Sequence, residues 1–302
     1  MSPSEDLTWW RLEFSFSQEL EESLFWKFAD LGNQRLAVKY SPENPTDGTL
    51  MAWFPAVEWA KADRDGFFLS LRPLADTFQL SLGSPVWTNV QDEDWSQGWK
   101  KHWHPDPVGE KLLILPAWLE VPEDQTERLV VRLDPGSAFG TGSHPTTRLC
   151  LEALEKAPPV GLQVADVGCG SGILTLASLG LGASKVYAMD TDSLAVSSTK
   201  DNALLNSILP SALNVFLGSV ETLKLEMNED RMDLVVCNIL APVIEQLAPK
   251  IDQVMKPKSR ALFSGLLVEQ ASPLLEGFVS MGWELITFTE KDRWALLEIV
   301  KT

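Results

Sequence analysis

The stretch Asp166-Val167-Gly168-Cys169-Gly170-Ser171-Gly172 decides the fold class of this 302-residue chain. Residues 163–167 form a mostly apolar run that is typical of a buried strand, and the small and aliphatic residues 173–181 favour a helix. Strand, glycine turn and helix in this order open a doubly wound α/β domain, in which ligands bind at the carboxyl ends of the strands. The glycines allow a tight turn and let a ligand lie directly against the backbone.

The spacing of the glycines excludes two common nucleotide sites. A dinucleotide fingerprint needs Gly-x-Gly-x-x-Gly, but its last position falls on Ile173 or Thr175 here, depending on the register. No Gly-Lys-Ser or Gly-Lys-Thr follows, so the turn is not a P-loop. The next expected strand, 185–189, ends in Asp190, where a carboxylate can accept both hydroxyl groups of a ribose. The pattern predicts a ribose-containing cofactor and is similar to that of class I methyltransferases, which use S-adenosylmethionine. The alternative is a plain strand–helix turn with a capping aspartate.

A second polar side chain follows the expected strand 232–237. The sequence there continues Asn238-Ile239-Leu240-Ala241-Pro242, and the amide of Asn238 offers both an acceptor and donors. In the class I fold this strand end faces the transferred methyl group. Enzymes that methylate planar amides or base amines often carry an aromatic ring just after the Asn, and Leu240 and Ala241 stand in that place here. The substitution leaves room for an aliphatic amine. The alternative for Asn238 is an N-cap of the expected helix 241–255.

A glycine-rich string precedes the expected helix 148–156. Residues 134–147 read Asp-Pro-Gly-Ser-Ala-Phe-Gly-Thr-Gly-Ser-His-Pro-Thr-Thr. Thr146 or Thr147 could simply cap the helix, but three glycines and Phe139 favour a functional loop, and such loops commonly act as lids. His144 is a candidate base by its position. We favour a role for it in shaping or covering the cofactor pocket, so the sequence assigns no catalytic residue.

These motifs resemble the ribosomal protein L-eleven methyltransferase family. The string 134–147, the segment 166–174, Asn238-Ile239-Leu240 and the Trp-rich segment 94–105 carry the resemblance, which runs from about residue 90 to the end. The first 90 residues match in length and coarse pattern only. The resemblance implies transfer of several methyl groups from S-adenosylmethionine to lysine side chains and to the N-terminal amine of one large-subunit ribosomal protein.

The resemblance also implies the residues of the cofactor site. Thr147 should contact the cofactor, Gly168 should lie against it, and Asp190 should hold the ribose hydroxyls. Asn238 should lie beside the methyl donor and the substrate amine. We add Gly170 from the geometry of the turn.

The order of expected elements divides the chain into an α/β methyltransferase domain with a seven-stranded sheet and a small N-terminal α+β domain. The resemblance implies a ferredoxin-like substrate-recognition domain at 1–91, a linker helix at 92–104 and an S-adenosylmethionine-binding domain at 105–302. Trp95, Trp99 and Trp103 recur every fourth residue, and we favour core packing where the domains meet over an exposed docking strip. The expected N-terminal elements are strands 9–16, 35–40, 50–54 and 86–90, helix 17–31, a helix within 67–82 and a loop at 41–48. After residue 190 they are helices 193–206, 241–255 and 268–281 and strands 213–217, 232–237, 260–264, 283–289 and 293–300.

Composition limits the remaining possibilities. The net charge of −17 would repel nucleic acid and attract a basic partner such as a ribosomal protein, although solubility alone could explain it. No run of eighteen apolar residues and no signal-peptide pattern is found, so we expect a cytoplasmic protein that does not bind membranes. Cys150, Cys169 and Cys237 form no C-x-x-C pair and suit small buried positions in a reducing compartment. The three histidines show no metal-ligand spacing with them, so no metal is expected. We expect a monomer, although no feature of the sequence encodes the oligomeric state.

Other functions stay open on the sequence alone. A class I methyltransferase that acts on another protein or on a small amine would share the same motifs. A non-catalytic cofactor-binding module is the alternative from another class, and it predicts damaged motifs. Thr147, Gly168, Asp190 and Asn238 are all in place.

Overall fold

The computed structural model describes residues 8–31, 33, 35–41, 44–91, 103–134, 142–227 and 231–302. They form two compact units, one in the chain up to His104 and one that starts at Pro105, and each is described by itself. The expected linker helix 92–104 lies outside the described residues except for Trp103 and His104, which are not helical. None of the helices that the structure describes is long and apolar enough to span a membrane.

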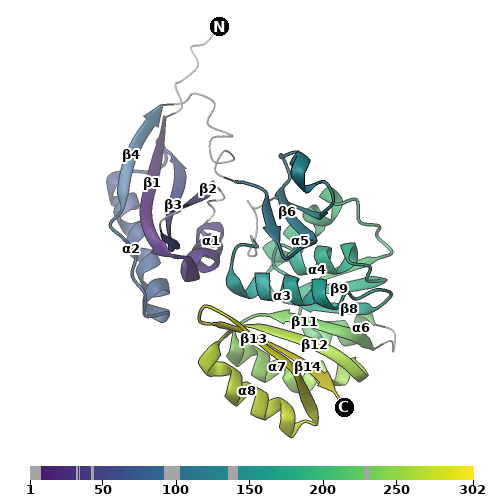
Figure 1. Cartoon of the computed structure of the whole chain (residues 1–302). Helices are drawn as coiled ribbons and strands as arrows, with labels where there is room; N and C mark the ends of the chain where they lie inside the picture. The colour runs from purple at the N-terminus through teal and green to yellow at the C-terminus, as the bar shows by residue number, and fades with distance from the viewer. Residues whose placement is uncertain are drawn as a thin grey trace. The chain divides into compact units, whose positions relative to one another are not determined.

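The first unit is an antiparallel four-stranded sheet with two helices (Figure 1). The strand order is β2-β3-β1-β4, with helices between β1 and β2 and between β3 and β4, which is the ferredoxin-like arrangement. Its elements are β1 (Thr8–Ser17), a 3-10 turn (Gln18–Leu20), α1 (Glu21–Asp30), β2 (Leu36–Ser41), β3 (Asn44–Pro55), α2 (Lys61–Thr77) and β4 (Val86–Gln91).

Alternation of side chains along β1 builds the core of this unit. Leu12, Phe14 and Phe16 are buried in one cluster with residues of both helices, as the period of two predicts. Trp103 joins the same cluster: its indole N–H donates to the carbonyl of Leu36 at 3.3 Å and its ring lies edge-on to Phe25. For Trp103 the structure therefore supports core packing, within the first unit. Trp95 and Trp99 lie outside the described residues.

The expected loop at 41–48 is wrong in its second half, because β3 already begins at Asn44. Pro, Asp and Gly in this stretch favour a turn, yet the strand pairs with β2 from Ser41↔Asn44 onward. Gly48 explains part of the difference. A Cβ atom there would lie 2.8 Å from the Phe16 ring and 2.9 Å from the Tyr40 ring, so the glycine makes room for two aromatic rings within the strand.

The second unit is a seven-stranded sheet of order β10-β9-β8-β11-β12-β14-β13. The first five strands in this order, β10, β9, β8, β11 and β12, are parallel to one another. Strand β14 lies between β12 and β13 and is antiparallel to both. Its elements are α3 (Pro145–Lys156), β8 (Gln163–Val167), α4 (Ile173–Gly180), β9 (Lys185–Asp190), α5 (Ser193–Leu205), β10 (Leu213–Leu217), α6 (Val220–Glu226), β11 (Met232–Asn238), α7 (Ala241–Val254), β12 (Met255–Leu267), α8 (Val268–Ser280), β13 (Trp283–Lys291) and β14 (Trp294–Lys301). The predicted doubly wound class is confirmed.

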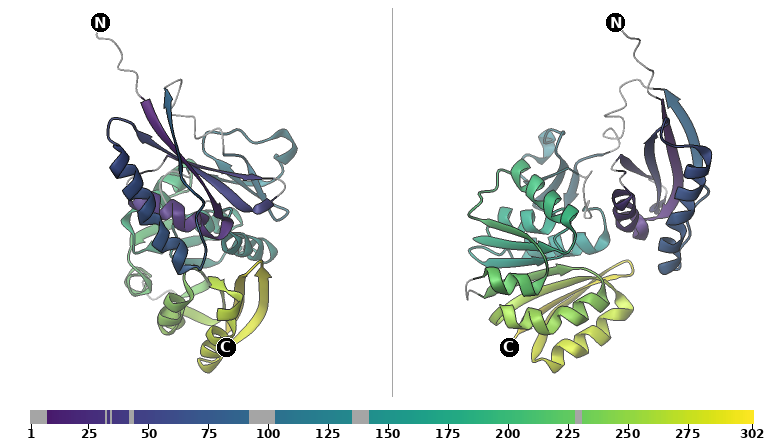
Figure 2. Two further views of the ribbon diagram at one scale, coloured as in Figure 1. Left: turned by 90° about the vertical axis from the view of Figure 1, so that its left-hand side faces the viewer. Right: turned by 180° about the vertical axis from the view of Figure 1, so that it is seen from behind.

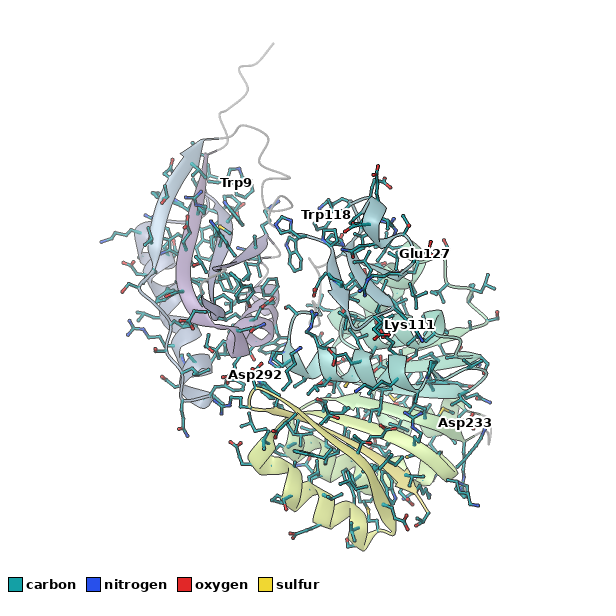
Figure 3. All side chains as sticks on the ribbon, in the orientation of Figure 1. Trp9, Lys111, Trp118, Glu127, Asp233 and Asp292 are labelled. Atoms are coloured by element: carbon teal, nitrogen blue, oxygen red, sulfur yellow. The ribbon has the colours of Figure 1, made fainter. Side chains whose placement is uncertain are left out.

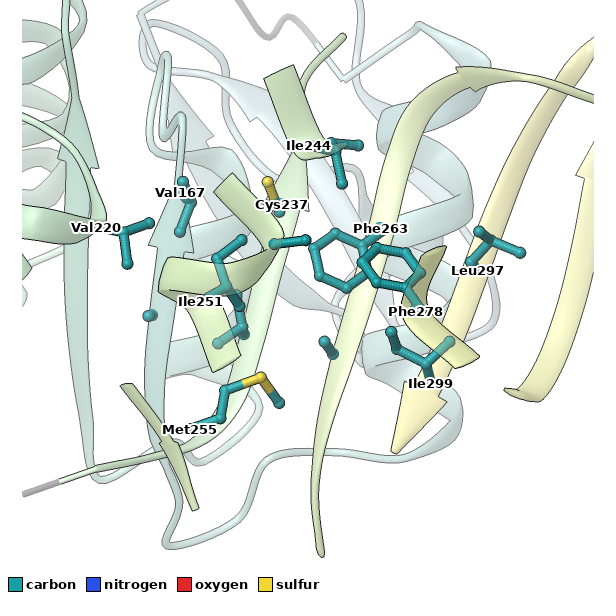
Figure 4. Packing of buried hydrophobic residues seen from close by; sticks show 14 of the residues in the cluster. Val167, Val220, Cys237, Ile244, Ile251, Met255, Phe263, Phe278, Leu297 and Ile299 are labelled. Carbon is teal, nitrogen blue, oxygen red and sulfur yellow. The ribbon is translucent and has the colours of Figure 1, made fainter. Parts of the chain in front are cut away.

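Helices cover both faces of this sheet (Figure 2), so its central strands are buried on both sides. Residues of α3, α4 and α5 pack on one face and residues of α6, α7 and α8 on the other. Ile244, Ala248 and Ile251 follow helical spacing on α7 and reach the second of these cores. Figure 4 shows Ile244 and Ile251 in front of the strands, near the Phe263 ring. The Phe263 and Phe278 rings are stacked, with their centroids 4.7 Å apart.

A small sheet that the sequence analysis did not predict precedes the main one. Strands β5 (Asp106–Val108), β6 (Leu112–Pro116) and β7 (Leu129–Leu133) form it, with β6 paired antiparallel to β5 and parallel to β7. A 3-10 turn at Glu123–Gln125 lies between β6 and β7. The sheet shares the core of α3 and α4, and β7 ends at Leu133, directly before the glycine-rich string.

Candidate functional site

The predicted site residues gather at the carboxyl ends of β8, β9 and β11, which are adjacent in the sheet. The helices after β8 and β9 lie on one face of the sheet, and the helix after β11 lies on the other. The strand order therefore reverses between β8 and β11. A crevice forms at such a switch point in doubly wound folds and is where their ligands bind.

The glycine turn between β8 and α4 is left-handed at three positions. Gly168, Gly170 and Gly172 have φ values of 79°, 53° and 83°, a region that residues with a side chain rarely adopt. The amide N–H groups of Gly168 and Cys169 both donate to the carbonyl of Met189, at 2.9 and 3.0 Å. The turn is therefore anchored to the end of β9, directly beside Asp190.

Asp190 is held by two backbone donors. Its Oδ2 accepts from the N–H of Gly170 at 3.1 Å and its Oδ1 from the N–H of Asp192 at 3.0 Å. A carboxylate has about four acceptor positions, so further positions stay available on this half-buried side chain. Gly170 and Asp190, two of the predicted cofactor residues, are in direct contact.

Thr147 and Asn238 also meet, although 91 positions separate them in sequence. The Asn238 Nδ2 donates to the Thr147 Oγ1 at 3.3 Å. Thr147 is buried in the first turn of α3, while Asn238 is half-buried at the end of β11. This is the only hydrogen bond of the Asn238 side chain within the described part of the chain, so the amide oxygen and one N–H remain for a ligand.

The capping alternatives for Thr146 or Thr147 and for Asn238 are wrong. Helix α3 begins at Pro145 rather than at Arg148, and its N-cap is His144, whose Nδ1 accepts from the N–H of Thr146 at 3.3 Å. His144 is buried, with its ring edge-on to Trp294. The N-cap of α7 is Leu240, which makes no side-chain cap, so Asn238 does not cap that helix. His144 thus caps α3, the helix that carries Thr147, and its role in the cofactor pocket stays a prediction.

Ile239, the residue after Asn238, packs closely between two glycines, Gly168 and Gly265. A Cβ atom on Gly168 would lie 2.4 Å from the Ile239 Cγ2, and one on Gly265 would lie 2.3 Å from the Ile239 carbonyl oxygen. Gly265 also has a positive φ, of 83°. The backbone around Asn238 is therefore positioned by close packing on both sides, one of which is the glycine turn.

Asp166 lies beneath the turn and is a residue that the sequence analysis did not place in the site. It is 1% exposed, and its Oδ2 accepts from the Thr175 Oγ1 at 2.6 Å. Its Oδ1 has no hydrogen-bond partner among the described residues. Burial raises the pKa of this carboxyl from 3.8 to about 7; the Thr175 hydrogen bond opposes that rise and the charge of Asp190 adds to it. Its place before the glycines was the signal that could have indicated it.

The cysteines beside the turn are fillers. Cys150, Cys169 and Cys237 are buried thiols that form no disulfide with one another. Burial raises the pKa of the Cys169 thiol and of the Cys237 thiol, so neither carries the thiolate that a nucleophile needs. No group of three or more potential metal ligands occurs in the part of the chain that the structure describes.

Part of the glycine-rich string cannot be placed in the site. Gly136, Phe139 and Gly140 lie outside the described residues. Gly142 is described: its φ is 92°, and a Cβ atom there would lie 2.9 Å from the Ile173 Cδ1. The end of the string therefore packs against the first residue of α4.

At the amino ends of the same strands, the polar contacts serve to join the strands. Asp233, labelled in Figure 3, lies at the start of β11, where its Oδ2 accepts from the N–H of Gln163 at 3.0 Å. Its Oδ1 forms an ion pair with the Lys256 ammonium at 2.7 Å. These contacts join neighbouring strands at their amino ends, away from the glycine turn.

The site fits a cofactor that carries a ribose. The Asp190 carboxylate is oriented by two N–H groups and keeps acceptor positions for a diol. The glycine turn brings bare backbone to the same strand end, and the amide of Asn238 has unused donor and acceptor capacity across the switch point.

A seven-stranded sheet of this order, with the turn and Asp190 at its carboxyl edge, is that of a class I S-adenosylmethionine-dependent methyltransferase. The family model of ribosomal protein L11 methyltransferase (PrmA) matches residues 8–302 of the chain. The chain therefore belongs to the ribosomal protein L11 methyltransferase family.

Individual relatives of the chain carry the name of the same family. A ribosomal protein L11 methyltransferase of Prochlorococcus marinus (strain MIT 9313) is 54% identical over 295 residues, which are 98% of each chain. That of Parasynechococcus marenigrum (strain WH8102) is 59% identical over 281 residues, 93% of this chain and 97% of the relative. The crystal structure of a ribosomal protein L11 methylase from Lactobacillus delbrueckii subsp. bulgaricus matches with a TM-score of 0.60 at 32% identity, over 66% of this chain and all of that one.

Proposed function

We propose that this protein transfers methyl groups from S-adenosylmethionine to ribosomal protein L11, on lysine side chains and on the N-terminal amine. The observation that carries the proposal is the meeting of Thr147 with Asn238 beside the Gly170–Asp190 contact, at the switch point of the sheet. The relatives named for this activity span nearly the whole chain, which supports the same substrate.

Each site residue receives a role in this proposal. Asp190 binds the ribose hydroxyls, and Gly168 and Gly170 give the cofactor access to the backbone. Thr147 and Asn238 lie on the side of the transferred group, where the free capacity of the Asn238 amide can orient the methyl donor and the incoming amine. No residue is assigned as a general base, because neither the Thr147 hydroxyl nor the Asn238 carboxamide takes up a proton near pH 7.

Positioning is the main task of such a site. The bound cofactor supplies an activated methyl group on a sulfonium, so the protein has to hold an unprotonated amine in line with it and exclude water. A lysine has a reference pKa near 10.4 and arrives mostly charged, so one proton must leave the amine before the transfer. Asn238 can then hold the neutral amine through its amide oxygen.

The surroundings of Asn238 favour an aliphatic amine over a nucleobase. Leu240 is exposed and Ala241 begins α7, so neither offers an aromatic face on which a planar base could stack. A nucleobase target would gain from such a stack. The net charge of −17 points the same way, because it favours a basic protein over nucleic acid as the partner.

The division of labour between domains is part of the proposal. Residues 1–91 recognise the substrate, 92–104 connect, and 105–302 bind the cofactor and carry out the transfer. The ferredoxin-like unit supports this division because it has a core of its own. We further propose that the protein acts as a monomer, does not bind nucleic acid or membranes, and resides in the cytoplasm.

The test is methyl transfer to purified, unmethylated L11, followed by intact-mass spectrometry, with wild-type protein and Asn238→Ala. Wild type should add several methylene increments to L11, and the variant should lower kcat/KM by about 100-fold because the amine is no longer aligned. Equal thermal stability of the two proteins controls for unfolding. A variant with unchanged kcat/KM would remove Asn238 from the site. The absence of methyl transfer by wild type that still binds the cofactor would direct the search to other basic proteins or small amines.

A further inference from the structure

One face of α5 carries polar side chains that are buried against the glycine turn. Thr199 is 0% exposed and Asn202, one turn later, is 1% exposed. Polar side chains are rarely buried to this extent without hydrogen bonds, so their partners reveal what they do. Neither residue belongs to the strand-end motifs described above.

The partners are two consecutive carbonyl groups of the turn. The Thr199 Oγ1 donates to the carbonyl of Gly170 at 3.0 Å, and the Asn202 Nδ2 donates to the carbonyl of Ser171 at 2.8 Å. Gly172 is packed against the same helix, since a Cβ atom there would lie 2.9 Å from the Thr199 Cγ2. The turn is therefore held along α5 from Gly170 to Gly172.

These bonds restrict how the peptide units of the turn can rotate. Glycine reaches left- and right-handed backbone conformations at similar energy, so a turn with Gly170 and Gly172 could adopt several shapes. A carbonyl and the N–H of the same peptide unit point in opposite directions. Holding the carbonyl of Ser171 on α5 therefore directs the N–H of Gly172, which donates to the carbonyl of Cys169 at 2.8 Å. The same turn shape keeps the N–H of Gly170 on Asp190.

Asn202 also connects the turn to a second segment. Its Oδ1 accepts from the N–H of Asp134 at 2.8 Å, at the end of β7. Both ends of one amide are thus used, which fixes the side chain in a single orientation. The Asn206 side chain, at the C-cap of α5, bonds to backbone groups of Arg132 and Asn202 and, within the described part of the chain, to no group of the glycine turn.

We propose that Thr199 and Asn202 are positioning residues of the cofactor site. They hold the carbonyls of Gly170 and Ser171 against α5, so that the glycine turn keeps its binding shape before the cofactor arrives. The proposal rests on the proposed function, because it takes the turn as the place where S-adenosylmethionine binds. A preformed turn saves the ordering that binding would otherwise require.

Two conservative variants and a matched control test the proposal. Thr199→Val keeps the shape of the side chain and removes the donor, and Asn202→Asp keeps the acceptor for Asp134 and removes the donor to Ser171. Asn206→Asp makes the same chemical change one turn away. The Kd for S-adenosylhomocysteine, measured by calorimetry, should rise about tenfold in the first two variants and stay within about twofold in the control. Thr199→Ser should restore the wild-type value.

Two further readouts separate positioning from general stability. Amide hydrogen exchange across 168–172 in the cofactor-free protein should become faster in Thr199→Val and Asn202→Asp, but not in Asn206→Asp. The KM for S-adenosylmethionine should rise with little change in kcat, because the lost interaction affects ground and transition states alike. Wild-type affinity and exchange in Thr199→Val would overturn the proposal, as would an equal loss of affinity in all three variants. If wild type itself fails to bind the cofactor, the proposed function fails instead.

Discussion

At the scale of single residues, Asp190 makes the strongest prediction. Asp190→Ala should raise the Kd for S-adenosylmethionine by about 10- to 100-fold, because hydrogen bonds to a charged group contribute about 1.5–3 kcal/mol. Isothermal titration calorimetry on wild type and variant measures this change in Kd. Asp192→Ala is the control: the Asp192 side chain caps α5 through the N–H of Leu194 at 2.8 Å, so its loss should affect stability alone. An unchanged Kd in Asp190→Ala would reject the ribose assignment.

Asp166 predicts a pH dependence of stability. Its pKa is raised from 3.8 to about 7 by burial, so the folded state binds this proton more tightly than the unfolded state. The resulting stability is present below about pH 4 and is lost as the pH rises through about 7. Asp166→Asn has no such proton and keeps an acceptor for Thr175. Between pH 4.5 and pH 8 the free energy of unfolding of the variant, minus that of wild type, should rise by about 3 kcal/mol, as measured with urea. Parallel pH curves for the two proteins would contradict the raised pKa.

At the scale of elements, the glycine turn allows a sharp comparison. Gly168→Ala places a methyl group 2.4 Å from the Ile239 Cγ2 and should weaken cofactor binding, because the turn or the Asn238 loop must move. Gly161→Ala has a similar positive φ, 73°, with nothing within 4 Å, so it adds the backbone strain without the contact. Both variants should lower the free energy of unfolding, by more than about 1 kcal/mol, but only Gly168→Ala should raise the Kd. Equal Kd values for the two would show that the approach of Ile239 to the turn has no role in binding.

The elements also show what sequence could predict. Strands 163–167 and 213–217 were predicted with the observed bounds, because each is a short, mostly apolar run that is bounded by turns. Burial differs between them: β8 is almost fully buried, whereas β10 is a half-buried edge strand. Strands β5 to β7 were not predicted; β5 has only three residues, and β5 and β6 each contain a proline, which disfavours a strand. Helix α6 was also not predicted; it has only 7 residues.

The candidate site, too, was predicted from the sequence only in part. Thr147, Gly168, Gly170, Asp190 and Asn238 stand in local motifs, and the structure brings them together as described. Thr199 and Asn202 carry no local signal, since a polar residue in a helix usually indicates a solvated face. Their partners at Gly170, Ser171 and Asp134 lie 29 to 68 positions away, and only the packing of α5 reveals them.

At the scale of the whole molecule, the proposed division of labour predicts the behaviour of a fragment. Residues 105–302 contain the sheet, the turn and both strand-end contacts, so this fragment should bind S-adenosylmethionine with nearly the Kd of the full chain. It should not methylate L11, because the substrate-recognition domain is missing. Circular dichroism establishes that the fragment is folded, and calorimetry and mass spectrometry give the two readouts. Full activity on L11 would show that the first domain is not needed for recognition.

The most direct measurement of the central claim offers the enzyme a choice of substrates. Total ribosomal proteins from cells that lack this methyltransferase are incubated with the protein and S-adenosylmethionine, and the intact mass of every protein is recorded. The account predicts mass gains in multiples of one methylene on L11, at its lysine and N-terminal amines, and on no other protein. A gain on a different protein, or none at all from an enzyme that binds its cofactor, would contradict it.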